Sequence, residues 1–217
     1  YEFIRSAATV LFKSAYGAEN LPLVMAAMPV VVFCGVALYG WILSQLGPRR
    51  TLLVTSLGSA IVILCCYLVL LMGSKEITPV LFLFKELYIV LLIEQYWSYI
   101  NSSISSSTAK KINGPITGIA GIGGAVGGTL VAMSAESLGT ESMVLMGAVA
   151  LIPAALVSNL AYRFFGEPEI PPKAESHGHL ALSLFRENPV LVSLIAIVLS
   201  SQAVSYTHLR AHETDSY

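Results

Sequence analysis

The chain has 217 residues, of which 55% are hydrophobic and 12% are charged, with a net charge of -1 and a mean hydropathy of +0.74. Soluble domains carry about 25% charged residues, so these values exclude an ordinary water-soluble protein. The charge patterning also gives no reason to expect a nucleic-acid partner.

Apolar residues are concentrated in blocks close to the roughly 20 residues that cross a ~30 Å hydrocarbon core. A first block, Tyr1–Tyr16, starts without a methionine and predicts a clipped membrane-spanning helix. Five further blocks predict full spans: Leu21–Leu46, Thr51–Met72, Pro79–Ile104, Ile116–Met133 and Met143–Phe165. The fold class expected is therefore all-α integral membrane, with six helices in residues 1–165.

The first span carries two cations, Arg5 and Lys13, which fall within about 80° of each other on one helix face. Charged groups inside a membrane helix usually face the bundle interior or a watery cavity. Both cations could instead reach the membrane surface by snorkelling.

The second span ends in a run that contains Gly40, Ser44, Gln45, Gly47, Arg49 and Arg50. This run resembles the loop between helices two and three of the major facilitator superfamily, G-x-x-x-D-R-x-G-R-R. Gly40, Gly47, Arg49 and Arg50 match, whereas Ser44 and Gln45 replace the acid and base. The resemblance implies a six-helix half built from two inverted three-helix repeats. The two arginines also fit a basic loop that only sets topology.

The fourth span holds Lys85, Glu86 and Glu94 within an apolar helix. A charge at the helix centre costs about 2.5 to 3.5 kcal/mol on insertion scales, so these groups are candidates for substrate binding or coupling. Glu86, Glu94, Trp97 and Asn101 fall within about 80° of one helix face. A structural ion pair that joins helices is the alternative explanation.

The run Lys85-Glu86-Leu87-Tyr88, then Tyr96-Trp97 with Asn101, then Ala109-Lys110-Lys111, is similar to the ATP/ADP translocases, the nucleotide transporters of intracellular bacteria and plastids. Those proteins carry E-L-W, F-W-x-F-A-N and A-K-R in the same order. The resemblance implies that Glu86 takes part in nucleotide transport and that cations of the first helix meet phosphates.

The fifth span is rich in glycine, with Gly118, Gly121, Gly124 and Gly128 at spacings of three and four. Small residues at this spacing let membrane helices pack closely, which is the function we expect here. A dinucleotide-binding turn would need a preceding strand, and Lys110-Lys111 precede a membrane span instead.

The polar, proline-containing stretch 166–188 predicts a linker, and the apolar block Pro189–Val204 predicts the start of a truncated seventh helix. His177 and His179 in the linker lack an evident third ligand, so neither a metal site nor a cofactor is expected. Ser205–Tyr217 resembles a translated sequencing-adaptor sequence found in metagenomic reading frames, and we expect a non-native tail. On this interpretation the chain is a fragment at both ends and lacks its C-terminal half.

Lysine and arginine favour one set of loops, which contains Arg49, Arg50, Lys110, Lys111, Arg163, Lys173 and Arg186. The opposite loops hold Lys75 beside four glutamates, and Lys13 is the exception. The positive-inside bias then predicts a cytoplasmic chain start and a cytoplasmic 166–188 loop, in a bacterial inner membrane.

Three functions are consistent with these patterns. The first is a secondary transporter of an anionic metabolite, ATP or ADP being the most specific version, in which Arg5 and Lys13 hold the anion and Glu86 or Glu94 balances charge. The second is a proton-coupled exporter, and the third is a membrane scaffold whose charges only tie helices together. An enzyme is not expected, because no intramembrane His/Glu metal set or Ser/His pair is present.

Overall fold

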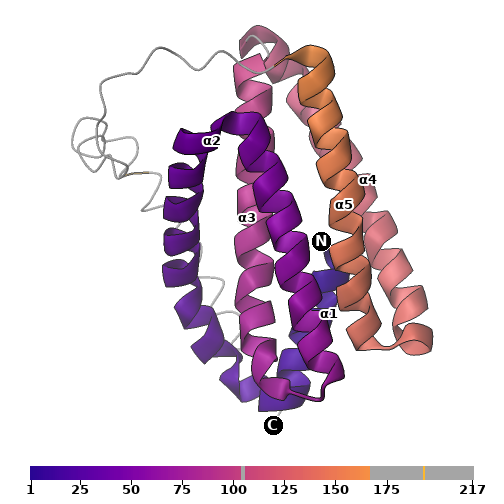
Figure 1. The fold of residues 1–217 in the computed structure, drawn as a ribbon. Coiled ribbons are helices and arrows are strands. Elements are labelled where there is room, and N and C mark those ends of the chain that lie inside the picture. Colours follow the sequence, from indigo (N-terminus) through magenta and orange to yellow (C-terminus); the bar gives the residue numbers. More distant parts are fainter. Residues whose placement is uncertain (104–105, 167–192, 194–217) are drawn as a thin grey trace. The chain divides into compact units, whose positions relative to one another are not determined.

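The computed structural model describes residues 1–103, 106–166 and 193. These belong mainly to one compact unit, Tyr1–Glu169. The predicted linker, the seventh span and the tail lie outside the described residues, apart from Gly166 and Ser193. Figure 1 shows that the described unit is helical. Its elements in order are α1 (Glu2–Tyr16), η1 (Ala18–Asn20), α2 (Leu21–Leu71), η2 (Lys75–Ile77), α3 (Thr78–Ser103), α4 (Ser106–Leu138) and α5 (Thr140–Phe165).

The described part of the chain contains no strand, so the all-α prediction is confirmed for it. Helix α2 is two helices, because Gly47 has φ 74° and ψ 169° within an otherwise helical run. Glycine has no Cβ and adopts this conformation readily, while Pro48 behind it is suited to the first position of a new helix. The two halves, a first arm (21–46) and a second arm (48–71), run antiparallel in Figure 1.

Within the described residues, three helical stretches are long and apolar enough to cross a membrane: Ala18–Leu71, Lys110–Ala135 and Thr140–Phe164. The first of them contains both arms of α2 and thus two of the predicted spans. Helix α1 has only 15 residues, and α3, with 26, carries Lys85, Glu86 and Glu94. These stretches indicate an integral membrane protein.

The core lies where α1, α3, α5 and the second arm of α2 meet. Helix α1 buries Ile4, Ala7, Ala8 and Phe12, a spacing that places them on one side of a 3.6-residue helix. Ile4 packs directly onto Gly147 of α5, where a Cβ would collide with it, and Leu87 of α3 packs in the same way onto Gly35 of the first arm. The two close approaches fix α1 against α5 and α3 against α2.

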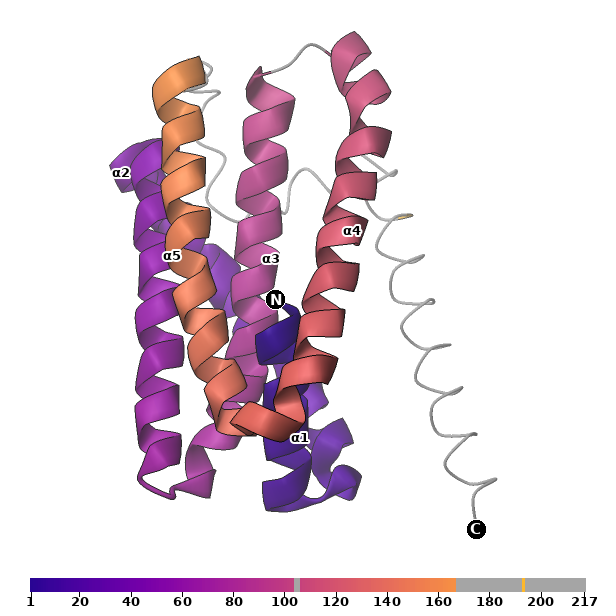
Figure 2. The ribbon, with the colours of Figure 1, turned by 90° about the vertical axis from the view of Figure 1, so that its right-hand side faces the viewer.

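Helix α4 begins earlier in the chain than the fifth predicted span. It begins at Ser106, so Lys110 and Lys111 lie in its first turns and not in a loop. A Cβ added at Gly118, Gly121, Gly124 or Gly128 would meet no atom of the described residues within 4 Å, because α4 packs mainly on α1 and α5 (Figure 2) and most of its surface is exposed. The packing role predicted for these glycines therefore stays a prediction.

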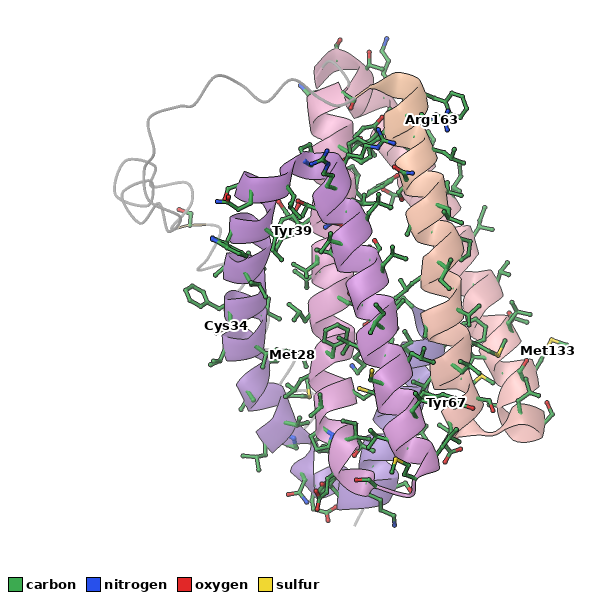
Figure 3. All side chains as sticks on the ribbon, in the orientation of Figure 1. Met28, Cys34, Tyr39, Tyr67, Met133 and Arg163 are labelled. Carbon is green, nitrogen blue, oxygen red and sulfur yellow. The ribbon has the colours of Figure 1, made fainter. Side chains whose placement is uncertain are left out.

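The two ends of the unit differ in charge. Gly47, the end of α3, the start of α4 and the end of α5 lie at one end, where Arg49, Arg50, Lys110, Lys111 and Arg163 gather; Figure 3 labels Arg163 there. We call it the basic end. Lys75 and Glu141 line a pocket at the opposite end.

Candidate functional site

Helices α1 and α3 pack against each other through aromatic side chains. The ring centroids of Phe12 and Phe82 are 5.3 Å apart, and those of Tyr1 and Tyr88 are 6.2 Å apart. Tyr88 is also stacked on Phe84 of its own helix. Aromatic pairs at these separations add to the stability that burial provides. The contact places the charged residues of predicted spans one and four on adjacent helices.

Lys85 is buried at this contact, with only 4% of its surface exposed. Its Nζ lies 4.1 Å from the centre of the Phe82 ring and donates a hydrogen bond to Glu86 Oε1 over 2.5 Å. The ring face and the carboxylate both stabilise the ammonium group. Lys85 is therefore the counter-ion of Glu86 in this conformation, and its amino group is turned away from solvent.

Glu86 is partly exposed, and its carboxylate has two partners. Besides Lys85, the Tyr1 hydroxyl donates to it at 3.4 and 3.5 Å, which is at the long limit for a hydrogen bond. Glu86 follows Thr78, the first residue of α3, by eight positions, or about 12 Å along the helix axis. The carboxylate is thus well below the helix end and is held by one strong and one weak contact.

The two cations of α1 lie at different depths. Arg5 is about 16 Å from Tyr16, the last residue of the helix, whereas Lys13 is within about 5 Å of it. The side chain of Arg5 is 59% exposed and makes a 3.7 Å ion pair with Glu2, one turn away. Such exposed pairs contribute about 0–1 kcal/mol, so Glu2 holds Arg5 only weakly. Lys13 is exposed and has no ion-pair partner in the described part of the chain.

The remaining predicted residues lie further along α3. Glu94 is exposed and about 12 Å beyond Glu86. It has no ion pair within the described residues, and it lies close enough to Tyr39 of the first arm, labelled in Figure 3, to act on it electrostatically. Trp97 is half-buried against Tyr96, with 5.5 Å between ring centroids. The side chain of Asn101 lies outside the described residues.

The predicted face of α3 is therefore divided between two levels. Glu86 belongs to the contact with α1, whereas Glu94 and Trp97 belong to the stretch nearer the basic end. Helical angle alone could not separate them, because it places residues around the axis and says nothing of which neighbouring helix reaches which level.

Gln95 is a buried polar residue that sequence reasoning missed. It is 4% exposed, and its Nε2 donates to Thr55 Oγ1 of the second arm over 2.6 Å. Thr55 uses its own proton on the carbonyl of Thr51, which fixes the amide orientation and leaves Gln95 Oε1 without a partner among the described groups. A glutamine within an apolar span was the signal available in the sequence.

At the basic end, Arg49 Nε donates to Asn159 Oδ1 of α5 over 2.8 Å. Tyr99 donates to the carbonyl of Ala161, and its ring lies 4.4 Å from that of Tyr162. Arg49 thus holds the turn at Gly47 against the end of α5. Of the other motif residues, Arg50 is exposed, and Ser44 Oγ donates to the carbonyl of Trp41. A Cβ at Gly40 would meet no atom of the described part of the chain within 4 Å.

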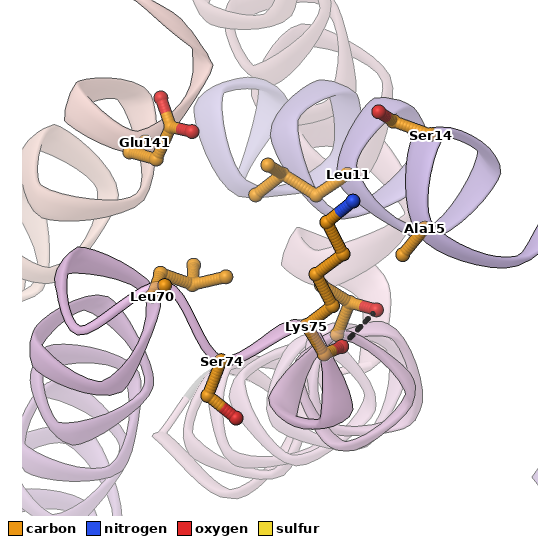
Figure 4. A pocket seen from close by; sticks show the side chains of 9 residues that line it. Leu11, Ser14, Ala15, Leu70, Ser74, Lys75 and Glu141 are labelled. Atoms are coloured by element: carbon orange, nitrogen blue, oxygen red, sulfur yellow. Dashed lines mark hydrogen bonds between the residues drawn. The ribbon is translucent and has the colours of Figure 1, made fainter.

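A pocket of about 160 Å³ lies at the opposite end, among α1, η2 and the starts of α3 and α5. Figure 4 shows Lys75 extended across it toward Leu11 and Ala15, with Glu141 on the facing wall. The backbone of Lys75 is fixed by a 2.9 Å hydrogen bond from Thr78 Oγ1 to its carbonyl. Ser14 and Ser74 also line the pocket, so its wall carries hydroxyl groups beside the two charged side chains.

The described residues contain no group of three or more metal-ligating side chains. Comparison of the chain with models of protein families, with curated proteins and with solved structures gives no match. The inferences that follow are therefore drawn from the charges and contacts of the helices.

Proposed function

We propose that the protein is a secondary transporter that moves a small anionic metabolite across a membrane by alternating access. The observation that carries the proposal is the exposed cationic side of α1 beside the Lys85–Glu86 pair of α3. Glu86 lies about 12 Å from the start of α3, and the start of α1, which carries Arg5, lies beside it, since Tyr1 contacts Glu86 (Figure 2). Both charges are therefore at a level where free exposure to lipid tails is costly. A water-filled cavity lined by both helices accounts for their exposure.

The charges favour an anion as the substrate. Glu86 is already neutralised by Lys85, whereas the one ion pair of Arg5 among the described residues is the solvent-exposed pair with Glu2. An incoming carboxylate or phosphate can replace Glu2, because arginine presents several donors in a fixed fork that matches such groups. Lys13 lies two turns closer to the helix end and would meet the anion as it enters.

Nucleotide exchange is the most specific form of this proposal. It is supported by the similarity of the Lys85–Tyr88, Tyr96–Asn101 and Ala109–Lys111 runs to the ATP/ADP translocases. It is also consistent with the aromatic pair Tyr96 and Trp97, a type of surface on which a base can stack. The gathering of cations at the basic end supports a cytoplasmic position for that end, and with it a major facilitator-type arrangement.

Uptake of labelled ATP by cells that express the full-length protein tests the proposal. Wild-type cells should take up the label and release it when ADP is added outside. Arg5→Gln should reduce uptake strongly, and Glu76→Gln, an exposed carboxylate in η2, is the matched control that should not. Lack of exchange with any nucleotide excludes the nucleotide version; lack of uptake of any organic anion excludes the transporter.

A proton-coupled exporter is the second candidate, and Glu94 is the observation that favours it. This carboxylate is exposed about 24 Å from the start of α3 and has no ion pair among the described groups, so it is placed to exchange a proton. Collapse of the proton gradient should stop export by such a protein, and Glu94→Gln should do the same. An exchanger would continue in both tests.

A membrane scaffold is the candidate of another class, and the Tyr1–Glu86–Lys85 contacts between α1 and α3 favour it. If these charges only tie helices together, Glu86→Gln should lower the amount of folded protein in proportion to any loss of function. A variant that folds normally but transports nothing would exclude the scaffold.

A further inference from the structure

The second arm of α2 and α5 enclose an apolar groove between them. It has a volume of about 260 Å³ and is lined by Leu57, Ile61 and Leu64 of the second arm and by Ala148, Val149 and Ile152 of α5. Ile61 and Val149 are more than half exposed, so the groove is open along its outer side. It contains no charged lining residue.

Each of the two helices carries an arginine in line with the groove. At 100° per residue, Arg50 falls within about 60° of Leu57, Ile61 and Leu64 on the second arm. On α5, Arg163 falls within about 60° of Ala148 and Ile152 by the same arithmetic. Both arginines therefore lie on the groove side of their helices, at the basic end of the unit.

The contact between Arg49 and Asn159 brings these arginines to the same level. Arg50 follows Arg49 directly, and Arg163 is one turn beyond Asn159 on the same side of α5. Both are exposed, and neither has an ion-pair partner within residues 1–103 and 106–166. The result is two exposed guanidinium groups on adjacent helices, with the apolar groove below them.

We propose that this groove binds an anionic phospholipid, with its phosphate between Arg50 and Arg163 and one acyl chain along the groove. Guanidinium groups bind phosphate oxygens in pairs of hydrogen bonds, which gives the headgroup its site. The groove begins about 10 Å below Arg50, and an acyl chain reaches about 15 Å, half the thickness of the hydrocarbon core. The lengths therefore match a lipid bound from the leaflet at the basic end.

Charge and shape together favour a phospholipid over other occupants. A free phosphate would bind the arginines and leave the apolar groove open to water or detergent. A neutral lipid would fill the groove and leave both arginines without a bound anion. A single molecule that satisfies both features is amphipathic and anionic, and the cytoplasmic leaflet is rich in such lipids.

Native mass spectrometry of the detergent-purified full-length protein tests this site. The protein is titrated with phosphatidylglycerol, with phosphatidylcholine of the same chains, and with glycerol 3-phosphate. We expect one phosphatidylglycerol to be retained at roughly tenfold lower concentration than phosphatidylcholine, a difference that corresponds to about 1.4 kcal/mol. Equal retention of the two lipids, or retention of glycerol 3-phosphate at the same concentration, would overturn the proposal.

Two variants and a matched control locate the lipid. Arg50→Gln with Arg163→Gln should abolish the preference for phosphatidylglycerol. Lys110→Gln with Lys111→Gln removes the same charge from the same end, away from the groove, and should leave the preference intact. If the lysine pair has the same effect as the arginine pair, the attraction is diffuse and the site does not exist.

The groove is tested separately with Ile61→Trp. Ile61 is 61% exposed, so a tryptophan side chain at this position fits without disturbing the core and fills the groove. We expect it to weaken the retention of both lipids, whereas unchanged retention would exclude the acyl-chain position. Each variant is compared with the wild type by size-exclusion chromatography, and Arg50→Lys with Arg163→Lys, which keeps the charge, should restore part of the preference. The outcome does not depend on transport activity.

Discussion

Arg49 and Asn159, 110 residues apart in the chain, are joined by a 2.8 Å hydrogen bond from Nε to Oδ1. The bond links the residue just after the turn at Gly47 to the last two turns of α5. In the major facilitator pattern that the run 40–50 resembles, an acid stands where this chain has Ser44. Here Arg49 of that run donates a hydrogen bond to the neutral side-chain amide of Asn159 on α5.

The Arg49–Asn159 bond should contribute measurably to stability. A hydrogen bond to a charged group is worth about 1.5–3 kcal/mol, so Arg49→Ala and Asn159→Ala should each lower the melting temperature of the purified protein. The double variant should lose less than the sum of the two, because the same bond is removed. Arg50→Ala is the control and should change the free energy of unfolding by less than about 0.5 kcal/mol. Strictly additive effects would show that the two residues do not interact.

Removing one partner of the Lys85–Glu86 ion pair should destabilise the protein more than replacing both partners by uncharged residues. Removal of one partner from a buried pair costs about 3–5 kcal/mol, and the lower part of this range applies because the Glu86 side chain is 30% exposed. Glu86→Gln alone should therefore destabilise the protein, while Lys85→Met with Glu86→Gln should recover most of the loss. Thermal unfolding in one detergent measures both. A double variant less stable than Glu86→Gln would contradict the assignment of Lys85 as counter-ion.

Glycine positions of two kinds should respond differently to alanine. At Gly147 the added methyl group meets Ile4, which is 1% exposed, so Gly147→Ala should destabilise by roughly 1–3 kcal/mol. At Gly121 no atom lies near, and Gly121→Ala should be neutral or stabilise by up to about 1 kcal/mol through helix propensity. Thermal unfolding of the two variants compares the same substitution at a buried and at an exposed position. A strong loss at Gly121 would mean that α4 packs on a partner beyond the residues described.

Gln95 should tolerate an apolar replacement better than an acidic one. Gln95→Met removes an amide whose Oε1 has no partner among the described groups, and Thr55 keeps its bond to the Thr51 carbonyl, so the free energy of unfolding should change by less than about 1 kcal/mol. Gln95→Glu puts a carboxylate into the same buried position and should cost several kcal/mol at neutral pH. Equal stability of the two variants would indicate that water reaches Gln95.

Much of the fold follows from local patterns in the sequence. The apolar blocks predict helix bounds close to those found: Pro79–Ile104 against Thr78–Ser103, and Met143–Phe165 against Thr140–Phe165. The break at Gly47 is also local, because glycine followed by proline ends one helix and starts another. The start of α4 is not predicted correctly, since polarity at Lys110 and Lys111 indicates a loop although both residues are compatible with a helix.

The candidate site is only partly predictable. The sequence identifies the charged residues of α1 and α3, and the structure brings these helices together. It does not reveal that Lys85 turns back onto Glu86 and Phe82 of its own helix, because that depends on the packing of α3, which leaves Lys85 buried. Gly35 and Gly147 make close contacts that the sequence did not single out, because only the three-dimensional arrangement decides which glycine meets a neighbour. The packing role of the α4 glycines stays a prediction.

Lys85 and Glu86, which form the ion pair beside the contact between α1 and α3, are consecutive residues of α3. Their adjacency affects what a displacement of α3 would cost. When α3 tilts or slides against α1, Lys85 and Glu86 travel together, so no opposite charges have to be pulled apart in a medium of low dielectric. The polar link between the two helices is the long hydrogen bond from Tyr1, which is weak. The energetic cost of such a displacement therefore lies in the aromatic contacts Phe12–Phe82 and Tyr1–Tyr88, and the ion pair, an electrically neutral dipole carried on α3, adds little to it.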